Sequence, residues 1–331
     1  MNYRQTLIST GISLVLSAPS FAYDLSADEY TQEDLTVIKK AETSANAEIL
    51  YNAANILISE SMMQENIEQG IKYLVLLAKK NHPKATLTLA DYYYEDSHYK
   101  EALKLYHQLE QKQDPYVLYS LGVMYFDGEG TQQDYKRGNK YYLAAAKLGY
   151  NDAMYQLAFS YNDGQGVKQD YTKAALWFKK SAEQGDASAM YNLGLSYLNG
   201  EGVKKDCAHA IKLLEQAINT DNHTRSYAKL GDIYYYTDYK AQCGFNKTDY
   251  KKSLSYFMKG AMQGNEYSQY MVGYSYRNGH GTYSNFSTAL AWYNIAEYNG
   301  YDASSEIKDI KQHMSAEDIE KAEKLQEQIL P

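Results

Sequence analysis

The sequence predicts an all-α fold, a right-handed superhelical solenoid of about seven helix-turn-helix repeats. The first observation behind this prediction is a heptapeptide, Tyr-x-Leu-(Gly/Ala)-x-x-Tyr, which recurs every 36 residues at 119–125, 155–161 and 191–197. The second is a Gly-x-Gly pair after each heptapeptide, and the third is an acidic residue that opens another apolar pattern of helical period. One helical hairpin cannot bury its apolar face alone, so we expect consecutive hairpins to stack around a continuous core.

One small residue marks the first helix of each repeat, because it lets a second helix approach closely. We call this residue the anchor and count positions from it. The anchors are Ala54, Ala90, Gly122, Ala158, Gly194, Gly231 and Gly273. They place seven repeats between residues 47 and 301, with an insertion in the sixth around residues 239–247. We therefore expect about fourteen repeat helices in antiparallel pairs, without sheet.

The connections between these helices carry residues that suit helix ends. The Gly-x-Gly pairs stand where the chain leaves a first helix and needs positive φ. Acidic residues stand where the second helix needs an N-cap and a negative charge. The pairs are Gly128/Gly130, Gly164/Gly166 and Gly200/Gly202, and the acidic residues are Asp134, Asp170, Asp206 and Asp249.

These repeats resemble the Sel-one-like repeat family, a subclass of the tetratricopeptide-like solenoids. The resemblance covers about residues 47–313 and is closest over residues 153–185. The motif residues in that segment are Leu157, Ala158, Tyr161, Gly164, Gly166, Val167, Asp170, Lys173, Ala174, Trp177, Ala182 and Gly185. The first repeat lacks the Gly-x-Gly turn, and the second is closer to an ordinary tetratricopeptide unit. Their local geometry is accordingly less well defined by the resemblance.

The resemblance implies a scaffold for protein–protein interaction. Exported bacterial relatives are associated with envelope assembly, host contact and immunity against toxic effectors. An alternative is a hydrolase, because some cysteine-rich relatives have been linked to β-lactam binding or hydrolysis. Those relatives carry a Cys pair in almost every repeat, whereas this chain has two Cys in all. A structural spacer without a specific ligand is a third interpretation.

The segments on either side of the repeats predict export of the protein and helices that cover the C-terminal end of the core. Residues 1–22 have the pattern of a signal peptide, with Arg4, a short apolar run and small residues at Ser20 and Ala22. We expect cleavage near Ala22 and a periplasmic or secreted protein. Residues 23–46 are predicted to be an acidic linker. Residues 302–331 are predicted to be C-terminal capping helices, the last one opened by a capping box, with a detached tail helix as the alternative.

Charge argues against two classes of partner. The chain has 33 Lys and Arg against 41 Asp and Glu, a net charge of −8. Nucleic acid requires a concentrated basic surface, and an anionic membrane face also attracts basic segments. No stretch after the signal peptide is apolar for long enough to insert into a membrane. We therefore expect a protein or peptide partner.

The two cysteines, Cys207 and Cys243, are predicted to form a disulfide in an oxidising compartment. They lie 13 and 12 residues after their anchors, so both belong to the turns of adjacent repeats, and stacked turns are neighbours. The alternative is a pair of free thiols whose Cα atoms lie too far apart to be bridged. A metal or nucleophile site at Cys207-Ala-His209 is a weaker interpretation than a disulfide cysteine beside a surface histidine.

Known catalytic motifs are absent from the sequence. It has no phosphate-binding loop, no dinucleotide-binding GxGxxG and no HExxH zinc motif. Gly194-Leu-Ser196 and Gly273-Tyr-Ser275 faintly resemble a hydrolase elbow, but both lack its second Gly and fall within predicted helices. We predict no cofactor, no metal and no enzymatic activity.

The predicted binding surface is a stripe on the first helices. Positions three before, one after and four after the anchor lie on the side away from the predicted core stripe, yet most of them are aromatic or apolar; Asp232, Asn162 and Arg277 are the exceptions in the third to seventh repeats. The resemblance to tetratricopeptide-like solenoids implies that this side lines a concave groove, where Tyr would anchor a partner. The alternative is a structural stripe packed against neighbouring helices. The predicted residues are Tyr119, Val123, Tyr155, Phe159, Tyr191, Leu195, Tyr235, Tyr270 and Tyr274.

Overall fold

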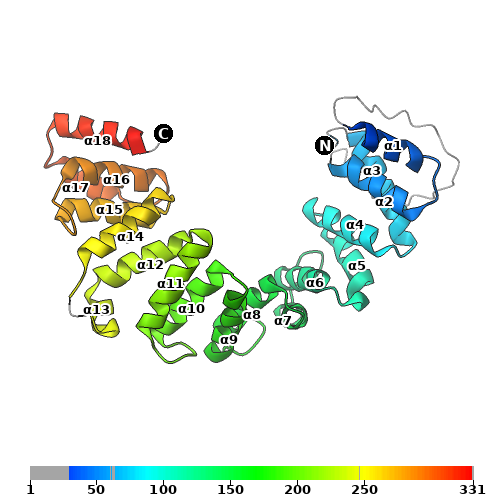
Figure 1. Cartoon of the computed structure of the whole chain (residues 1–331), viewed down its shortest axis with the longest axis horizontal. Coiled ribbons are helices and arrows are strands. Elements are labelled where there is room, and N and C mark those ends of the chain that lie inside the picture. The colour runs from blue at the N-terminus through cyan, green and yellow to red at the C-terminus, as the bar shows by residue number, and fades with distance from the viewer. Residues whose placement is uncertain (1–29, 60, 62–63, 246, 330–331) are drawn as a thin grey trace. The chain divides into compact units, whose positions relative to one another are not determined.

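The computed structural model describes residues 30–59, 61, 64–245 and 247–329, and the predicted signal peptide lies outside these ranges. Across the described residues the chain forms helices and no strand, which confirms the predicted all-α class (Figure 1). None of the helices in this part of the chain is both long and apolar enough to cross a membrane. The helices group into two compact units, residues 1–109 and 110–331.

The first unit contains the two repeats that depart from the motif. Its helices are α1 Gln32–Ala41, α2 Ala47–Ser59, α3 Gln64–Lys79, α4 Pro83–Glu95 and α5 Tyr99–Leu109. Helices α2 and α3 form one hairpin, and α4 and α5 form the next. Leu57, Leu74 and Leu77 are buried in the core of this unit. Both repeats are therefore helical hairpins although they lack parts of the motif.

The predicted linker over residues 23–46 is wrong for residues 32–41, which form α1. This helix begins at a capping box between Thr31 and Asp34. It packs against α2 and buries the side chain of Ile38 completely. Acidic residues in its first turn favour the helix, because the N-terminal end of the helix dipole is positive. The acidic composition that suggested a linker is thus compatible with a capped helix.

The second unit contains five hairpins, an additional helix and a C-terminal pair. Its helices are α6 Pro115–Asp127, α7 Tyr135–Lys147, α8 Asn151–Asp163, α9 Tyr171–Glu183, α10 Ala187–Asn199, α11 Cys207–Asp221, α12 Thr224–Tyr235, α13 Thr237–Cys243, α14 Tyr250–Met262, α15 Glu266–Asn278, α16 Phe286–Tyr298, α17 Ser304–Lys311 and α18 Ala316–Ile329. The first helices of the hairpins are α6, α8, α10, α12 and α15. The fourteen expected repeat helices are α2 to α12 and α14 to α16, and α13 lies in the insertion.

The anchor glycines allow the two helices of a hairpin to touch. A Cβ atom on Gly122 would lie 2.5 Å from the ring of Tyr142, and one on Gly231 would lie 2.4 Å from the ring of Phe257. Real Cβ atoms do not approach carbon so closely, and therefore a large ring on the second helix requires glycine on the first. Small anchors and bulky partners together set the spacing within each hairpin.

The Gly-x-Gly turns end one helix and dock against the preceding repeat. The first glycine is a left-handed C-cap, as at Gly200 with φ 78°. The second approaches the backbone at the start of the preceding repeat's second helix, so that a Cβ on Gly202 would lie 2.0 Å from the carbonyl oxygen of Tyr171. The turn therefore fixes both the hairpin and its stacking on the previous one.

The predicted N-caps are present on the second helices. Each acidic side chain accepts a hydrogen bond from the backbone N–H three residues later. The N–H of Lys173 is the main cause of the lowered pKa of Asp170. The capping residues are Asp134, Asp170, Asp206 and Asp249.

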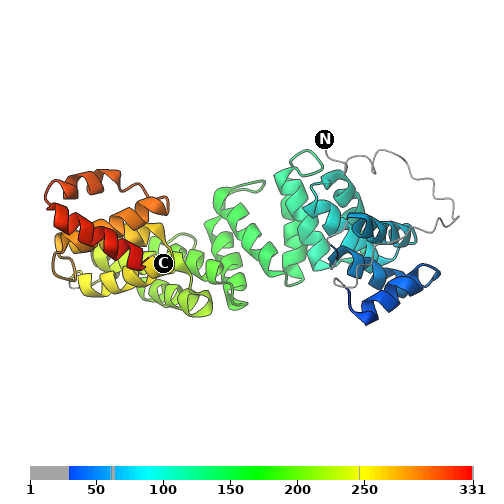
Figure 2. The ribbon, with the colours of Figure 1, turned by 90° about the horizontal axis from the view of Figure 1, so that it is seen from above.

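Helix α18 packs against the last hairpin. The side chain of Ser315 accepts a hydrogen bond from the N–H of Asp318 at its start. Ala322 is fully buried, and Ile319 and Leu325 pack against the same core. Figures 1 and 2 show α18, in red, lying along α16, which it contacts. The helix is therefore a packed end of the second unit and not a detached tail.

Candidate interaction surface

The residues of the predicted stripe lie on the first helices of the five hairpins in the second unit. We call this stripe the tyrosine face. All nine of its side chains are half-buried. They are Tyr119, Val123, Tyr155, Phe159, Tyr191, Leu195, Tyr235, Tyr270 and Tyr274. By contrast, the predicted core stripe, five and one before and three after the anchor, is Ala153, Leu157 and Tyr161 in the fourth repeat. Ala153 and Leu157 are buried almost completely, as predicted, whereas Tyr161 is half-buried. The tyrosine face is thus an intermediate layer between core and surface.

Rings of the tyrosine face pack on one side against the second helix of the same hairpin. The ring of Tyr119 lies 5.8 Å from that of Tyr142, centroid to centroid. Tyr270 makes the equivalent contact with Tyr293 at 5.5 Å. Aromatic pairs at such distances add stability beyond the area they bury. The second helices therefore hold these rings in place.

Several tyrosine hydroxyls three positions before the anchor bond to the next hairpin or to α17. The side-chain amide of Asn192 donates to the hydroxyl of Tyr155 at 3.4 Å, across 37 residues. The hydroxyl of Tyr270 donates to Glu306 at 3.1 Å, across 36 residues. In the first unit, the hydroxyls of Tyr51 and Thr88 lie 3.2 Å apart, again across 37 residues. This recurrent spacing shows that the tyrosine three positions before the anchor also has a structural role.

The sixth repeat interrupts the apolar face with a buried ion pair. Asp232 stands one position after the anchor, where other repeats have Val123, Phe159 or Leu195, and its residue is only 8% exposed. Its carboxylate lies 3.2 Å from the ammonium of Lys229 and accepts a hydrogen bond from Tyr267 at 2.8 Å. Burial raises the pKa of Asp232, although Lys229 acts in the opposite direction. A charge buried here requires these partners.

The predicted disulfide joins Cys207 to Cys243, with their Cα atoms 5.2 Å apart. Cys207 begins α11 and Cys243 ends α13, so the bond attaches the insertion to the preceding repeat. The insertion has two further contacts: Phe245 stacks on Tyr234 with ring centroids 5.5 Å apart, and the hydroxyl of Tyr239 lies 3.5 Å from the Lys229 ammonium. The insertion therefore reaches the buried ion pair of the tyrosine face.

The weaker catalytic interpretations find no support in the geometry. Cys207 is consumed by the disulfide, and among the described residues no group of three His, Cys, Asp or Glu side chains is arranged to hold a metal. The hydroxyl of Ser196 donates to the carbonyl of Asn192, and that of Ser275 to the carbonyl of Met271. Both serines thus make the local bonds of helical serine and do not form a nucleophile elbow.

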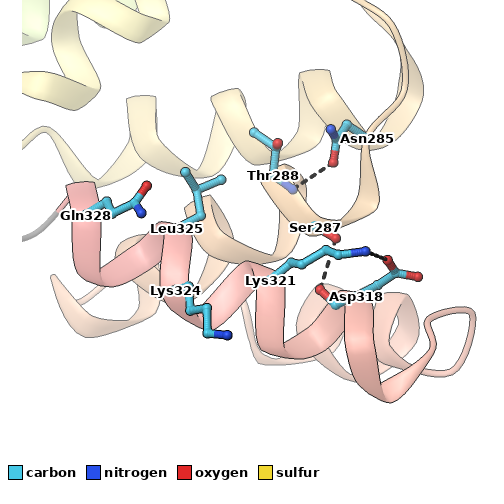
Figure 3. Close-up of a pocket in the computed structure, with 8 residues that line it drawn as sticks. All are labelled: Asn285, Ser287, Thr288, Asp318, Lys321, Lys324, Leu325 and Gln328. Carbon is cyan, nitrogen blue, oxygen red and sulfur yellow. Dashed lines mark hydrogen bonds and ion pairs between the residues drawn. The ribbon is translucent and has the colours of Figure 1, made fainter.

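A cavity of about 510 Å³ lies between the start of α16 and α18 (Figure 3). Its two lysines already have acidic partners on their own helix: Lys321 lies 2.8 Å from Glu317, and Lys324 lies 2.7 Å from Glu320. Leu325 is the one apolar side chain among its lining residues. The cavity is open to solvent and its charged residues are already paired, so we assign it no ligand.

The pattern of the Sel1 repeat matches five segments of the chain, more than half of its length. These segments are residues 115–150, 151–186, 187–221, 224–265 and 266–301. They coincide with the five hairpins of the second unit. The two earlier hairpins, whose motifs depart most, lie outside the matched segments.

Solved structures with the same architecture include Sel1 repeat proteins. One from Oxalobacter formigenes is 24% identical, with a TM-score of 0.60 over 67% of this chain and 88% of that chain. The protein c5321, a protective antigen present in uropathogenic Escherichia coli strains and displaying an SLR fold, is 17% identical, with a TM-score of 0.54 over 92% of each chain. The immunity protein Pa5087 from Pseudomonas aeruginosa is 15% identical, with a TM-score of 0.41 over 65% of this chain and 83% of that chain. The first two comparisons support the solenoid fold.

Proposed function

Because the chain belongs to the Sel1 repeat family, we propose that it is an interaction scaffold which binds a protein or peptide partner on its tyrosine face. Sel1 repeat solenoids typically mediate protein–protein interaction. Adaptor, host-contact and effector-immunity roles are three forms of this function. They differ in the partner and share the binding surface.

One observation carries the choice of surface: in four of the five hairpins of the second unit the same position holds a half-buried ring, at Tyr119, Tyr155, Tyr191 and Tyr270. Packing on the second helices fixes the rings before any partner arrives, so little side-chain entropy is lost on binding. Tyrosine also offers an apolar ring and a polar hydroxyl, a combination enriched in interfaces. A row of fixed, partly exposed tyrosines favours a protein partner over a small molecule.

The proposal includes export and excludes catalysis. Cleavage near Ala22 would release a periplasmic or secreted protein, and the Cys207–Cys243 disulfide is stable in such an oxidising compartment. The single Cys pair argues against the hydrolase function linked to cysteine-rich relatives. We expect the purified chain not to hydrolyse a chromogenic β-lactam such as nitrocefin.

Replacing three rings of the face tests the proposal. In the variant Tyr155→Ala, Tyr191→Ala, Tyr270→Ala we expect retained helical circular dichroism, a lowered melting temperature and loss of the partner that the wild type captures from an extract of the producing cell. The melting temperature falls because these rings also pack on second helices. If this variant captures the partner as well as the wild type, the tyrosine face is not the binding surface.

A matched control separates binding from stability. The triple variant Tyr161→Ala, Tyr197→Ala, Tyr276→Ala removes the same number of rings at the position three after the anchor. These rings are also half-buried, and Lys173 lies over Tyr161 at 5.1 Å. We expect this control to lose similar stability and to keep the partner. Equal loss of binding in both variants would show that destabilisation alone is responsible.

A further inference from the structure

Charge is distributed unevenly along the tyrosine face. Helices α6 and α8 contain three carboxylates, Asp127, Asp152 and Asp163, and no Lys or Arg. All three are exposed, and none has an ion-pair partner among the described residues. Helix α10 contains no charged residue. The beginning of the face is therefore acidic, and the helix in its middle carries no charge apart from its N-cap residue, Asp186.

These carboxylates border the face itself. Asp152 precedes Tyr155 by three positions, and Asp127 follows Val123 by four, so each is a neighbour of a face residue on the helix surface. Both carboxylates also lie close enough to Tyr119 to raise the pKa of its hydroxyl, in addition to the larger effect of burial. Unpaired negative charge thus stands beside the rings of α6 and α8.

Helix α12 has the opposite sign. It contains Arg225 and Lys229 and one acidic residue, Asp232, which pairs with Lys229. Two positive charges and one negative charge leave one positive charge in excess. Arg225 is exposed, and both cations act to lower the pKa of Tyr191, whereas burial raises it. The excess positive charge therefore borders the face at Tyr191.

We propose that the tyrosine face binds an extended polypeptide segment of opposite polarity. Its Lys or Arg residues would lie over α6 and α8, its apolar or aromatic residues over α10, and its Asp or Glu residues over α12. This inference rests on the proposed function and specifies the partner's chemistry. A uniformly anionic partner such as nucleic acid would meet unpaired carboxylates at α6 and α8, which repel phosphate. Charge complementarity of this kind fixes the register of a bound chain and suppresses wrong partners.

A random peptide library displayed on phage, selected on the immobilised mature chain, tests the polarity. Peptides of about fifteen residues reach roughly 50 Å when extended, which is enough to cross several helices. We expect selected peptides to carry Lys or Arg towards one end, aromatic or apolar residues in the middle and Asp or Glu towards the other end. Their binding should weaken as salt rises, because the charges that guide them are exposed.

Charge reversal at one end provides the decisive comparison. In the variant Asp127→Lys, Asp152→Lys helices α6 and α8 become basic, as α12 is, so selection should yield peptides that are acidic at both ends. Peptides selected on the wild type should bind this variant about tenfold more weakly. The control Glu183→Lys, Glu201→Lys reverses two exposed carboxylates, on α9 and in a Gly-x-Gly turn, and should select the wild-type pattern.

Three other outcomes overturn the inference. Selected peptides that are aromatic but show no charge polarity contradict it and leave the proposed function intact. The same holds if the reversal variant selects the same pattern as the wild type. Peptides that bind the Tyr155, Tyr191 and Tyr270 triple variant as tightly as the wild type, or failure to enrich any peptide, count against the tyrosine face as a binding surface altogether.

Discussion

At the residue scale, the glycines in the turns within and between the helical hairpins meet two different requirements. Gly202 combines a φ of 70° with backbone contact, since a Cβ would lie 2.0 Å from the carbonyl oxygen of Tyr171. Gly185 has a φ of 94°, but a Cβ there would meet nothing within 4 Å. The first glycine is needed for backbone conformation and for close approach, and the second for backbone conformation alone.

Alanine substitution separates these two requirements. We expect Gly185→Ala to lower the free energy of unfolding by about 1 kcal/mol, the cost of a left-handed conformation for a residue with Cβ. Gly202→Ala should cost about 3 kcal/mol or more, because the turn must also move away from the preceding helix. Urea unfolding of both variants measures the difference. Equal decreases in the free energy of unfolding would mean that Gly202 does not contribute to the stacking of repeats.

The sequence predicts individual residues well where a local rule applies. Asp134 and Asp170 cap helices because an acidic residue before an apolar helix bonds the free N–H groups of the first turn. The partner of a tyrosine hydroxyl obeys no local rule. Asn192 is 37 residues from Tyr155, and only the stacking of two hairpins shows that they meet. The tyrosine face was accordingly predicted by position, but its structural bonds were not.

At the element scale, the repeats follow from period and spacing, whereas α1 and α13 do not. Helix α1 has few apolar residues, and its capping box between Thr31 and Asp34 was the available signal. Helix α13 lies in the insertion, where the sequence shows only a break in the repeat length. Its position depends on the disulfide and on long-range contacts of Tyr239 and Phe245. Neither contact has a sequence pattern of its own.

The disulfide should stabilise this element strongly. It closes a loop across 36 residues, for which loop entropy predicts a contribution of about 3–4 kcal/mol. We expect the variant Cys207→Ser, Cys243→Ser to have a free energy of unfolding lower by about that amount, with α13 losing hydrogen-exchange protection first. Thiol titration of the denatured, unreduced wild type should detect no free thiol. Two free thiols per chain would contradict the bond.

At the scale of the whole molecule, the burial of tyrosines makes the free energy of unfolding decrease at alkaline pH. Burial raises the pKa of many tyrosines in the described part of the chain above the ordinary value of 10.0, among them Tyr119, Tyr155 and Tyr191. A pKa raised in the folded state means that folding favours the neutral hydroxyl. The resulting stability is complete below pH 10 and is lost as pH rises through the folded-state values.

We therefore expect cooperative unfolding above about pH 10, with helical circular dichroism and tyrosinate absorbance changing together. Buried tyrosines can ionise only when the helices separate, so their part of the absorbance should rise with the loss of helix, apart from the part contributed by exposed rings such as Tyr283. Ionisation of all the tyrosines with no loss of helix would show that the buried rings are accessible to water in the folded chain.

The central claim is that a partner binds the tyrosine face, and site-specific photo-crosslinking tests it most directly. A photoreactive phenylalanine analogue would replace Phe159 or Leu195 on the face, and Lys147 or Lys179 on second helices as exposed controls. In cells that export the chain, we expect covalent adducts with one partner from positions 159 and 195 and none from positions 147 and 179. Adducts from the second helices with none from the face would contradict the account.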